Sequence, residues 1–157
     1  MSAVLLSGGW ESVLCLLRAM AQGEVNAYFF DYGQPYALEE YKAVSRLQKK
    51  LGFTLKIVKI GDLSEEDGIF ANRNEYFIQL LVLSGEKVVW FGCRCPWAFL
   101  DKYKDSNAQF AKKLAKQLHI TIFTPAIMLP KWMVKSYVLD NDVTADDIFS
   151  SEGYKYE

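Results

Sequence analysis

The sequence predicts an α/β fold with a doubly wound, mainly parallel five-stranded sheet and helices on both faces. Short apolar runs alternate with longer stretches of helical periodicity along the chain. Most of these runs show little period-two alternation, which is typical of strands covered on both faces. The intervening stretches are long enough to form the crossover helices that join parallel strands.

In the N-terminal half, apolar runs at 3–6 and 25–30 predict two strands, each followed by a glycine-containing turn. The stretch 12–22 has apolar residues at helical spacing and stops at Gly23, so it predicts the first helix. A second helix is predicted over 37–51. The residues expected on its apolar face are Leu38, Tyr41, Val44 and Leu47.

The C-terminal half continues the alternation. The predicted elements are a strand at 53–60, a helix at 72–84, a strand at 87–91, a helix at 107–118, a strand at 120–123 and a helix at 131–139. Lys112, Lys113 and Lys116 are expected on a solvated helix face. His119 is expected as a capping or surface residue rather than a catalytic base. Without internal repeats or linkers, the chain is predicted to form one domain over 1–157.

Composition excludes several classes of protein. The chain is 51% apolar and 15% aromatic with a net charge of −1, which excludes intrinsic disorder and argues against broad nucleic-acid binding. No apolar run reaches the length of a membrane span, and no signal peptide is recognised, so a cytoplasmic protein is expected. Three cysteines and one histidine argue against a disulfide framework or a zinc site. Cys93 and Cys95 are therefore expected to be a buried or surface thiol pair.

The most informative segment is Ala3–Ser12, where an apolar strand meets a Ser-Gly-Gly turn that opens into a helix. Glycines let backbone N–H groups approach an oxyanion, and the helix N-terminus adds partial positive charge. Hydroxyl groups of Ser7 and Ser12 add hydrogen-bond donors. In a doubly wound sheet, such a turn lies at the carboxyl end of a strand, where ligands bind. The alternative is an ordinary turn with a serine cap.

The segment 7–12, Ser-Gly-Gly-Trp-Glu-Ser, resembles the SGGxDS motif of the PP-loop ATP pyrophosphatases, with Glu11 in place of the family's Asp. Further segments resemble those of the 7-cyano-7-deazaguanine synthase (QueC-like) family. In chain order they are FDYGQ at 30–34, ANRN at 71–74, YKDSNAQF at 103–110 and TPAIMLPK at 124–131. The resemblance implies the PP-loop, or adenine nucleotide alpha hydrolase-like, fold.

The resemblance also implies an activity. That family is an ATP-dependent ligase that converts 7-carboxy-7-deazaguanine and ammonia to the nitrile, in queuosine-type modification of nucleic acids. The implied steps are adenylation of the carboxylate, attack by ammonia to give an amide, and dehydration through a second activation. ATP and Mg²⁺ are the implied cofactors. The implied partners are small molecules, with no direct nucleic-acid or membrane contact and a possible homodimer.

The resemblance assigns roles by position on the nucleotide side. The residues expected to bind pyrophosphate are Ser7, Gly8, Gly9 and Ser12. Asp31, Tyr32 and Gln34 are expected to border the nucleotide and the substrate, with ordinary turn chemistry at a strand end as the alternative for all three. Glu11 is expected to act in catalysis by holding Mg²⁺ or ordering the loop. Its alternative is a first-turn acid favoured by the helix dipole.

The remaining roles concern residues expected to contact the acceptor substrate, together with Lys131. Arg73 and Lys131 are expected to act in catalysis by pairing with carboxylate or phosphate oxygens. Asn74, Gln34 and Asp105 are expected to bind the substrate, Asp105 through the amino edge of the guanine-like ring. The alternatives are a helix-start salt bridge and cap at 73–74, a solvated lysine at 131, and a helix N-cap at Asp105.

The pattern departs from the family at several points. The family has a four-cysteine zinc motif near its C-terminus, whereas this chain has Ser151 at the first cysteine position and ends at Glu157. A short form lacking that motif, with no zinc, is therefore expected. The departures cluster on the acceptor side. Two alternatives follow: a PP-loop enzyme that adenylates another acceptor, or a degenerate homologue that binds a nucleotide, a deazaguanine or a partner protein without turnover.

Overall fold

The computed structural model describes residues 1–63, 72–93 and 108–150. These residues contain a five-stranded sheet of order β3-β2-β1-β4-β5, in which every neighbouring pair is parallel. The strands are β1 (Ser2–Leu5), β2 (Val25–Asp31), β3 (Thr54–Lys59), β4 (Val88–Trp90) and β5 (Thr121–Phe123). The predicted doubly wound parallel sheet is confirmed.

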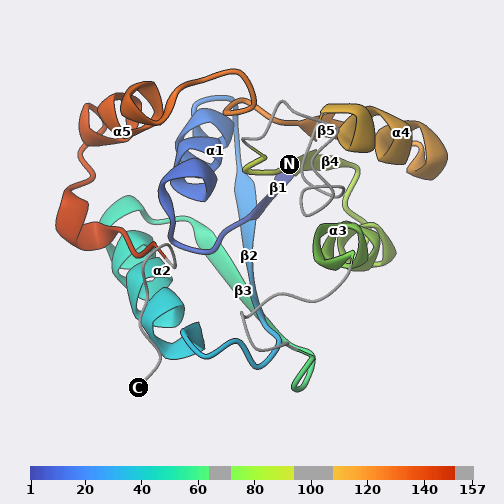
Figure 1. Cartoon of the computed structure of the whole chain (residues 1–157), viewed down its shortest axis with the longest axis horizontal. Helices are drawn as coiled ribbons and strands as arrows, with labels where there is room; N and C mark the ends of the chain where they lie inside the picture. The colour runs from blue at the N-terminus through green and yellow to red at the C-terminus, as the bar shows by residue number, and fades with distance from the viewer. Residues whose placement is uncertain (64–71, 94–107, 151–157) are drawn as a thin grey trace.

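Helices cover both faces of the sheet (Figure 1). The described helices are α1 (Trp10–Met20), α2 (Ala37–Leu51), α3 (Arg73–Leu83), α4 (Ala108–Leu118), α5 (Lys131–Leu139) and a 3₁₀ turn, η2 (Ala145–Asp147). One apolar core lies between the sheet and α1, α2 and α5, and a second lies between the sheet and α3 and α4. The five predicted helices agree with α1 to α5 to within a few residues.

The start of α1 differs from the predicted one. The helix begins at Trp10, before the expected residue Ser12, because Gly9 takes the N-cap position with φ −81° and ψ 168°. No side chain caps this end of the helix. The alternative of a serine-capped turn is therefore wrong, and the uncapped helix N-terminus directly follows the Ser-Gly-Gly turn.

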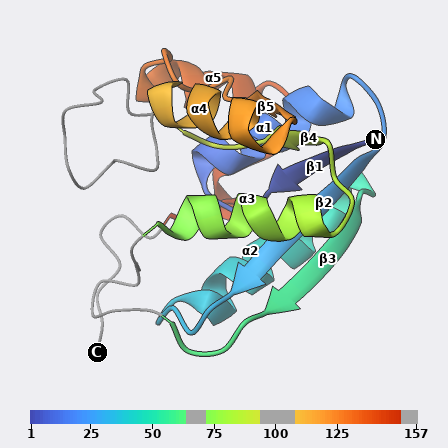
Figure 2. The same cartoon turned by 90° about the vertical axis from the view of Figure 1, so that its right-hand side faces the viewer.

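The sheet is not equally covered along its width. Six of the seven residues of β2 are buried, as expected for an inner strand. β3 lies at the sheet edge (Figure 2). The side chain of Ile57 in this strand is 44% exposed. The expectation that the strands are covered on both faces therefore fails at the two edge strands, because no residue of β3 or β5 is buried.

The buried face of α2 differs from the predicted one. Leu38 is 58% exposed and Tyr41 is 41% exposed, whereas Val44 and Leu47 are buried. At 3.6 residues per turn, Leu38 lies on the opposite side of the helix from Leu47. The stripe that packs on the sheet comprises Glu40, Ala43, Val44 and Leu47. This stripe has the i, i+3, i+4, i+7 spacing of a helix face that packs against a core, and its first member is a carboxylate.

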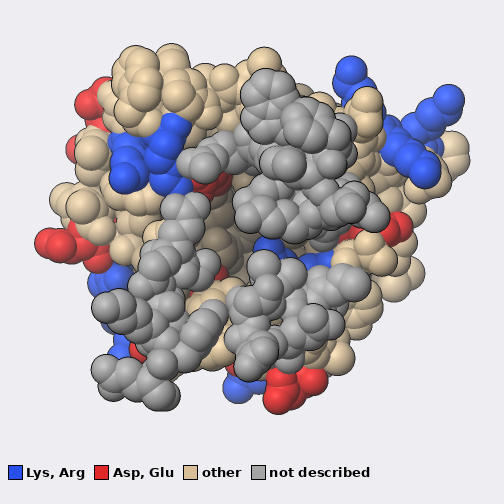
Figure 3. Space-filling view, viewed as in Figure 1, with Lys and Arg blue, Asp and Glu red and all other residues tan. Residues whose placement is uncertain are grey.

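The solvated lysine face of α4 is confirmed. Lys112, Lys113 and Lys116 are exposed, and Figure 3 shows basic side chains gathered over this helix. His119 follows α4, is exposed and has a φ of 55°. This left-handed conformation is common just after a helix end, which confirms a surface position.

In the described part of the chain, none of the helices is long and apolar enough to span a membrane.

Substitutions in α2 test its orientation. Leu47→Ala should lower the free energy of unfolding by about 2–5 kcal/mol, because it leaves a cavity at a fully buried position. Leu38→Ala makes the same chemical change on the exposed face and should alter that free energy by less than about 0.5 kcal/mol. Urea unfolding followed by circular dichroism measures both. Equal losses would contradict the observed orientation.

Candidate functional site

A cavity of about 220 Å³ lies where the carboxyl ends of β1, β2 and β4 meet. The chain reverses its direction of travel across the sheet between β1 and β4, and such switch points are the usual ligand sites of doubly wound sheets. The lining residues are Leu5, Leu6, Ser7, Gly9, Glu11, Ser12, Tyr28, Phe29, Phe30, Tyr32, Gln34, Tyr36, Glu40, Arg73, Asn74, Phe77, Phe91 and Gly92.

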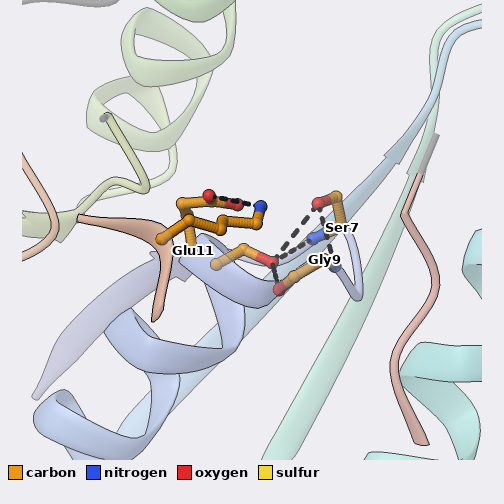
Figure 4. Close-up of polar contacts among 5 residues, drawn as sticks. Ser7, Gly9 and Glu11 are labelled. Carbon is orange, nitrogen blue, oxygen red and sulfur yellow. Dashed lines mark hydrogen bonds and ion pairs between the residues drawn. The ribbon is translucent and has the colours of Figure 1, made fainter. Parts of the chain in front are cut away.

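The loop after β1 is organised by its two serines (Figure 4). The Ser7 backbone N–H donates to Ser12 Oγ at 3.2 Å, and Ser12 Oγ donates to the Gly9 carbonyl at 3.1 Å. The two hydroxyl oxygens lie 3.3 Å apart. Both hydroxyls therefore lie at the uncapped start of α1, and they can turn toward an anion without any change of fold.

The two glycines of this loop have different environments. Gly8 has a φ of +90°, and a Cβ built there would lie 3.0 Å from Ala43 Cβ. Its carbonyl accepts a hydrogen bond from the Phe149 N–H. Gly9 lines the cavity, but Gly8 does not. Gly8 therefore allows the loop to pack on α2, while Gly9 contributes a backbone wall without a side chain.

The loop after β4 approaches α1 closely at Gly92. A Cβ built on Gly92 would lie 3.0 Å from Ser12 N and 3.1 Å from Glu11 C. Because both contacts are with backbone, no larger residue fits there without moving the helix. The absence of a side chain at Gly92 therefore keeps the start of α1 against the end of β4.

Glu11 and Lys131 form an ion pair beside the loop. Lys131 Nζ lies 2.7 Å from Glu11 Oε1, and both side chains are partly exposed (Figure 4). Glu11 is in the first turn of α1 and lines the cavity. Lys131 is the first residue of α5 and does not line the cavity itself. The structure thus brings together two residues 120 positions apart that the sequence nominated separately.

Gln34 organises the loop after β2. Its Nε2 donates to the Phe30 carbonyl at 3.0 Å and to Glu40 Oε1 at 2.9 Å, and its Oε1 accepts from the Tyr32 N–H at 2.9 Å. Asp31 accepts from the Gly33 N–H at 3.2 Å and does not line the cavity. Asp31 therefore hydrogen-bonds within the turn, as its alternative role predicts, whereas Tyr32 and Gln34 both line the cavity.

Arg73 enters the cavity from the start of α3. Its Nη1 donates to Tyr32 Oη at 2.9 Å, and the guanidinium carbon lies 5.8 Å from the centre of the Tyr32 ring. Burial raises the pKa of Tyr32, so this phenol stays neutral at physiological pH. Asn74 follows Arg73 on the same cavity wall. Residues from the loop after β2 and from α3, far apart in sequence, therefore meet in the lining of the cavity.

Glu40 is a cavity residue that the sequence analysis missed. It is only 7% exposed, and burial raises its pKa to about 7 from the ordinary 4.5, although Gln34 and Arg73 oppose this shift. The signal that could have found it is its spacing to Ala43, Val44 and Leu47, which puts a carboxylate in the buried stripe of α2.

Most nominated residues lie together at the cavity, with four exceptions. Those that line it are Ser7, Gly9, Glu11, Ser12, Tyr32, Gln34, Arg73 and Asn74. Gly8, Asp31 and Lys131 lie next to it, in the contacts given above. Asp105, Cys95 and Ser151 fall outside the described residues, whereas Cys93 is buried, as expected for one of its two alternatives. The described residues contain no cluster of three or more metal-ligating His, Cys, Asp or Glu side chains.

Glu40 should make the stability of the fold depend on pH. Between pH 4.5 and about 7 the folded protein keeps the Glu40 proton and the unfolded chain loses it, so stability falls as pH rises. Relative to Glu40→Gln, the wild type should lose up to about 3 kcal/mol across this window. Chemical denaturation at a series of pH values measures the difference. Parallel curves for the two proteins would contradict the shifted pKa.

Comparison with known proteins identifies a family. Residues 1–80 match the family model described as Queuosine biosynthesis protein QueC. Two curated relatives, both named 7-cyano-7-deazaguanine synthase, come from Leptospira interrogans serogroup Icterohaemorrhagiae, serovars copenhageni and Lai. Each is 43% identical over 60 residues, which cover 38% of this chain and 24% of the relative. The chain thus spans about a quarter of the length of these relatives.

Solved structures show the same fold at low sequence identity. A structure titled as a predicted subunit of tRNA methyltransferase, from Methanocaldococcus jannaschii DSM, has a TM-score of 0.58 and 13% identity, over 88% of this chain and 73% of the other. PH1313 from Pyrococcus horikoshii Ot3 has a TM-score of 0.52 and 19% identity, over 90% of this chain and 40% of the other. Since the family model matches residues 1–80 of 157, the chain belongs to the QueC family of queuosine biosynthesis proteins.

Proposed function

We propose that this protein is an ATP-dependent carbon–nitrogen ligase that converts 7-carboxy-7-deazaguanine and ammonia to 7-cyano-7-deazaguanine. The observation that carries the proposal is the loop at 7–12. It matches the phosphate-binding motif of the family and lies at the uncapped N-terminus of α1, on the wall of a cavity at the switch point. Family membership supports the choice of substrate.

The phosphate end of the site has suitable chemistry for ATP. The first N–H groups of a helix have no intrahelical acceptor, and the helix dipole favours an anion there. Ser7, Gly9 and Ser12 would hold the pyrophosphate portion through hydroxyl and backbone donors. Glu11 fits a Mg²⁺ site made of one carboxylate and phosphate oxygens, and the ion would neutralise phosphate charge when bound. Lys131 lies beside Glu11 and can transfer its contact to a phosphate oxygen.

The other end of the cavity has suitable groups for the acceptor. Arg73 has a planar fork of donors that matches a carboxylate, and Tyr32 fixes its orientation by the hydrogen bond at 2.9 Å. Asn74 adds an amide on the same wall. These residues would hold the acceptor carboxylate in line with the α-phosphorus of ATP, and such positioning accounts for much of the rate in reactions of this kind.

The proposed reaction consumes two ATP. In the first half, a carboxylate oxygen displaces pyrophosphate from ATP, and ammonia then displaces AMP from the acyl carbon to give the amide. In the second half, the amide oxygen displaces pyrophosphate from another ATP, and loss of AMP and a proton leaves the nitrile. Each half needs a stabilised pentavalent α-phosphorus, so the same helix N-terminus and cationic side chains would serve both.

The deciding experiment is incubation of the purified chain with Mg²⁺, ATP, ammonium and 7-carboxy-7-deazaguanine, followed by mass spectrometry. Nitrile and AMP are expected in a ratio of one to two. Amide without nitrile would indicate that only the first half-reaction occurs. Nucleotide binding without AMP would overturn the proposal and favour the alternative of a homologue that binds without turnover.

Lys131→Met separates a catalytic role of the ion pair from a structural one. Because the pair is partly exposed, its loss should change the free energy of unfolding by less than about 1 kcal/mol. AMP formation should fall roughly 100-fold, because a cation near the transferring phosphorus is lost. Lys50→Met is the matched control, since Lys50 pairs with Asp147 at the same 2.7 Å away from the cavity and should leave AMP formation unchanged. Equal activities of the two variants would exclude the catalytic role.

Gly9 tests the phosphate loop itself. Gly9→Trp should abolish calorimetric binding of Mg-ATP, because the indole would fill the space in front of the helix N-terminus. Gly9→Ala should retain binding within about tenfold, since a Cβ there meets Phe149 O at 3.5 Å and Ser7 Oγ at 3.6 Å, which are ordinary contacts. Gly9 also has a φ that any residue adopts. Undiminished binding by the tryptophan variant would place ATP elsewhere.

A further inference from the structure

Glu40 is fixed in place at the cavity wall by Gln34. The amide of Gln34 is held at both ends by the backbone of β2 and its following turn, through the Phe30 carbonyl and the Tyr32 N–H. Its Nε2 also donates to Glu40 Oε1 at 2.9 Å, which ties one oxygen of the carboxylate to the loop after β2. This contact restricts how the carboxylate can turn within the cavity wall.

The second oxygen of Glu40 is left for the cavity. Among the described residues, no hydrogen bond to Glu40 Oε2 is present, and Trp90 Nε1 is the one fully buried side-chain nitrogen or oxygen without a partner. Oε2 therefore keeps its access to the cavity that Glu40 lines. An ionised carboxylate is an acceptor only, so a ligand group that binds Oε2 must bring an N–H or O–H donor.

The surrounding walls suit a flat ring. Phe30 and Phe77 both line the cavity and stack with their ring centres 4.3 Å apart at an interplanar angle of 9°. Tyr32 lies against Phe77 at 5.6 Å, and Tyr36 adds another aromatic side chain to the lining. Phe30 and Phe77 cover one face of each other, so their remaining surface, together with Tyr32 and Tyr36, gives the cavity an aromatic lining against which a heterocyclic base can pack. The site therefore combines aromatic surface with one oriented acceptor.

We propose that Glu40 is a specificity-determining residue whose Oε2 accepts a hydrogen bond from the amino group of a purine-like base held in this cavity. The inference rests on the proposed function, because both of its substrates carry such a base. The adenine of ATP and the 2-aminopyrimidinone edge of the deazaguanine present the same chemistry, an exocyclic amino group on a flat ring. Which of the two bases lies against Glu40 is decided by the experiment.

Glu40→Gln reverses the hydrogen-bonding character of this position. Gln34 Nε2 still requires an acceptor, so the new carbonyl oxygen takes the place of Oε1 and the new NH₂ takes the place of Oε2. The cavity then presents a donor where the wild type presents an acceptor. A base with a carbonyl oxygen at that edge should now bind better than one with an amino group.

Two pairs of ligands test the inference by calorimetry at pH 8. The first pair is ATP and inosine triphosphate, which has a carbonyl in place of the adenine amino group. The second is 7-carboxy-7-deazaguanine and its analogue without the 2-amino group. In the wild type, the amino-bearing member of one pair should bind roughly 10- to 100-fold more tightly, as for a hydrogen bond to a charged group. Glu40→Gln should abolish or reverse that preference.

Glu39→Gln is the control, since it makes the same change one residue earlier on α2, at a half-buried position that does not line the cavity. It should keep the wild-type preference. Loss of the preference within the ATP pair places adenine against Glu40, and loss within the acceptor pair places the deazaguanine there; either supports the inference. Preferences that are the same in Glu40→Gln and the wild type, or no binding by the wild type, overturn it.

The outcome is separable from that of the proposed function. A Glu40-dependent preference without AMP formation would leave the inference standing and remove the ligase assignment. AMP formation with unchanged base preference in Glu40→Gln would do the opposite. Thermal unfolding of both variants verifies that they are folded, and Glu40→Gln is expected to be at least as stable as the wild type because it replaces a buried carboxylate by a neutral amide.

Discussion

The close approach between Gly92 and the first turn of α1 is the constraint on which the rest of the site depends. β1 and β4 are neighbours in the sheet but far apart in sequence, and the chain turns to opposite sides after each of them. Because Gly92 has no Cβ, the backbone of α1 lies against it, and the helix N-terminus is held over the ends of the strands.

The loop after β2 is linked to α2 through Gln34. Gln34 hydrogen-bonds through both ends of its amide to the turn and to Glu40, so it links the position of β2 to that of α2. Placing an ionisable carboxyl in the buried stripe of α2 lowers the stability of the fold at neutral pH, as the raised pKa of Glu40 shows. Fold stability alone does not explain this residue, since an apolar side chain would pack there without that cost.

The sequence predicted the order of strands and helices because periodicity is a local property that survives folding. Prediction from the sequence failed for features that depend on which elements pack together, such as the buried face of a helix. Leu38 and Tyr41 are apolar, so the α2 face was assigned to them, whereas the real buried stripe begins with Glu40 and was hidden by its charge. Likewise, nothing near Glu11 in the sequence indicates Lys131, because the two meet only when α5 packs on α1.

The family match covers most of the cavity. All cavity-lining residues except Phe91 and Gly92 fall within residues 1–80, the region that matches the family model. The loop at 7–12, the turn organised by Gln34 and the start of α3 therefore all lie in the part of the chain that matches the family model. Lys131 lies outside that region and reaches it through its ion pair with Glu11. Because Lys131 does not itself line the cavity, Glu11 and Lys131 are best understood as a pair rather than as separate contributions.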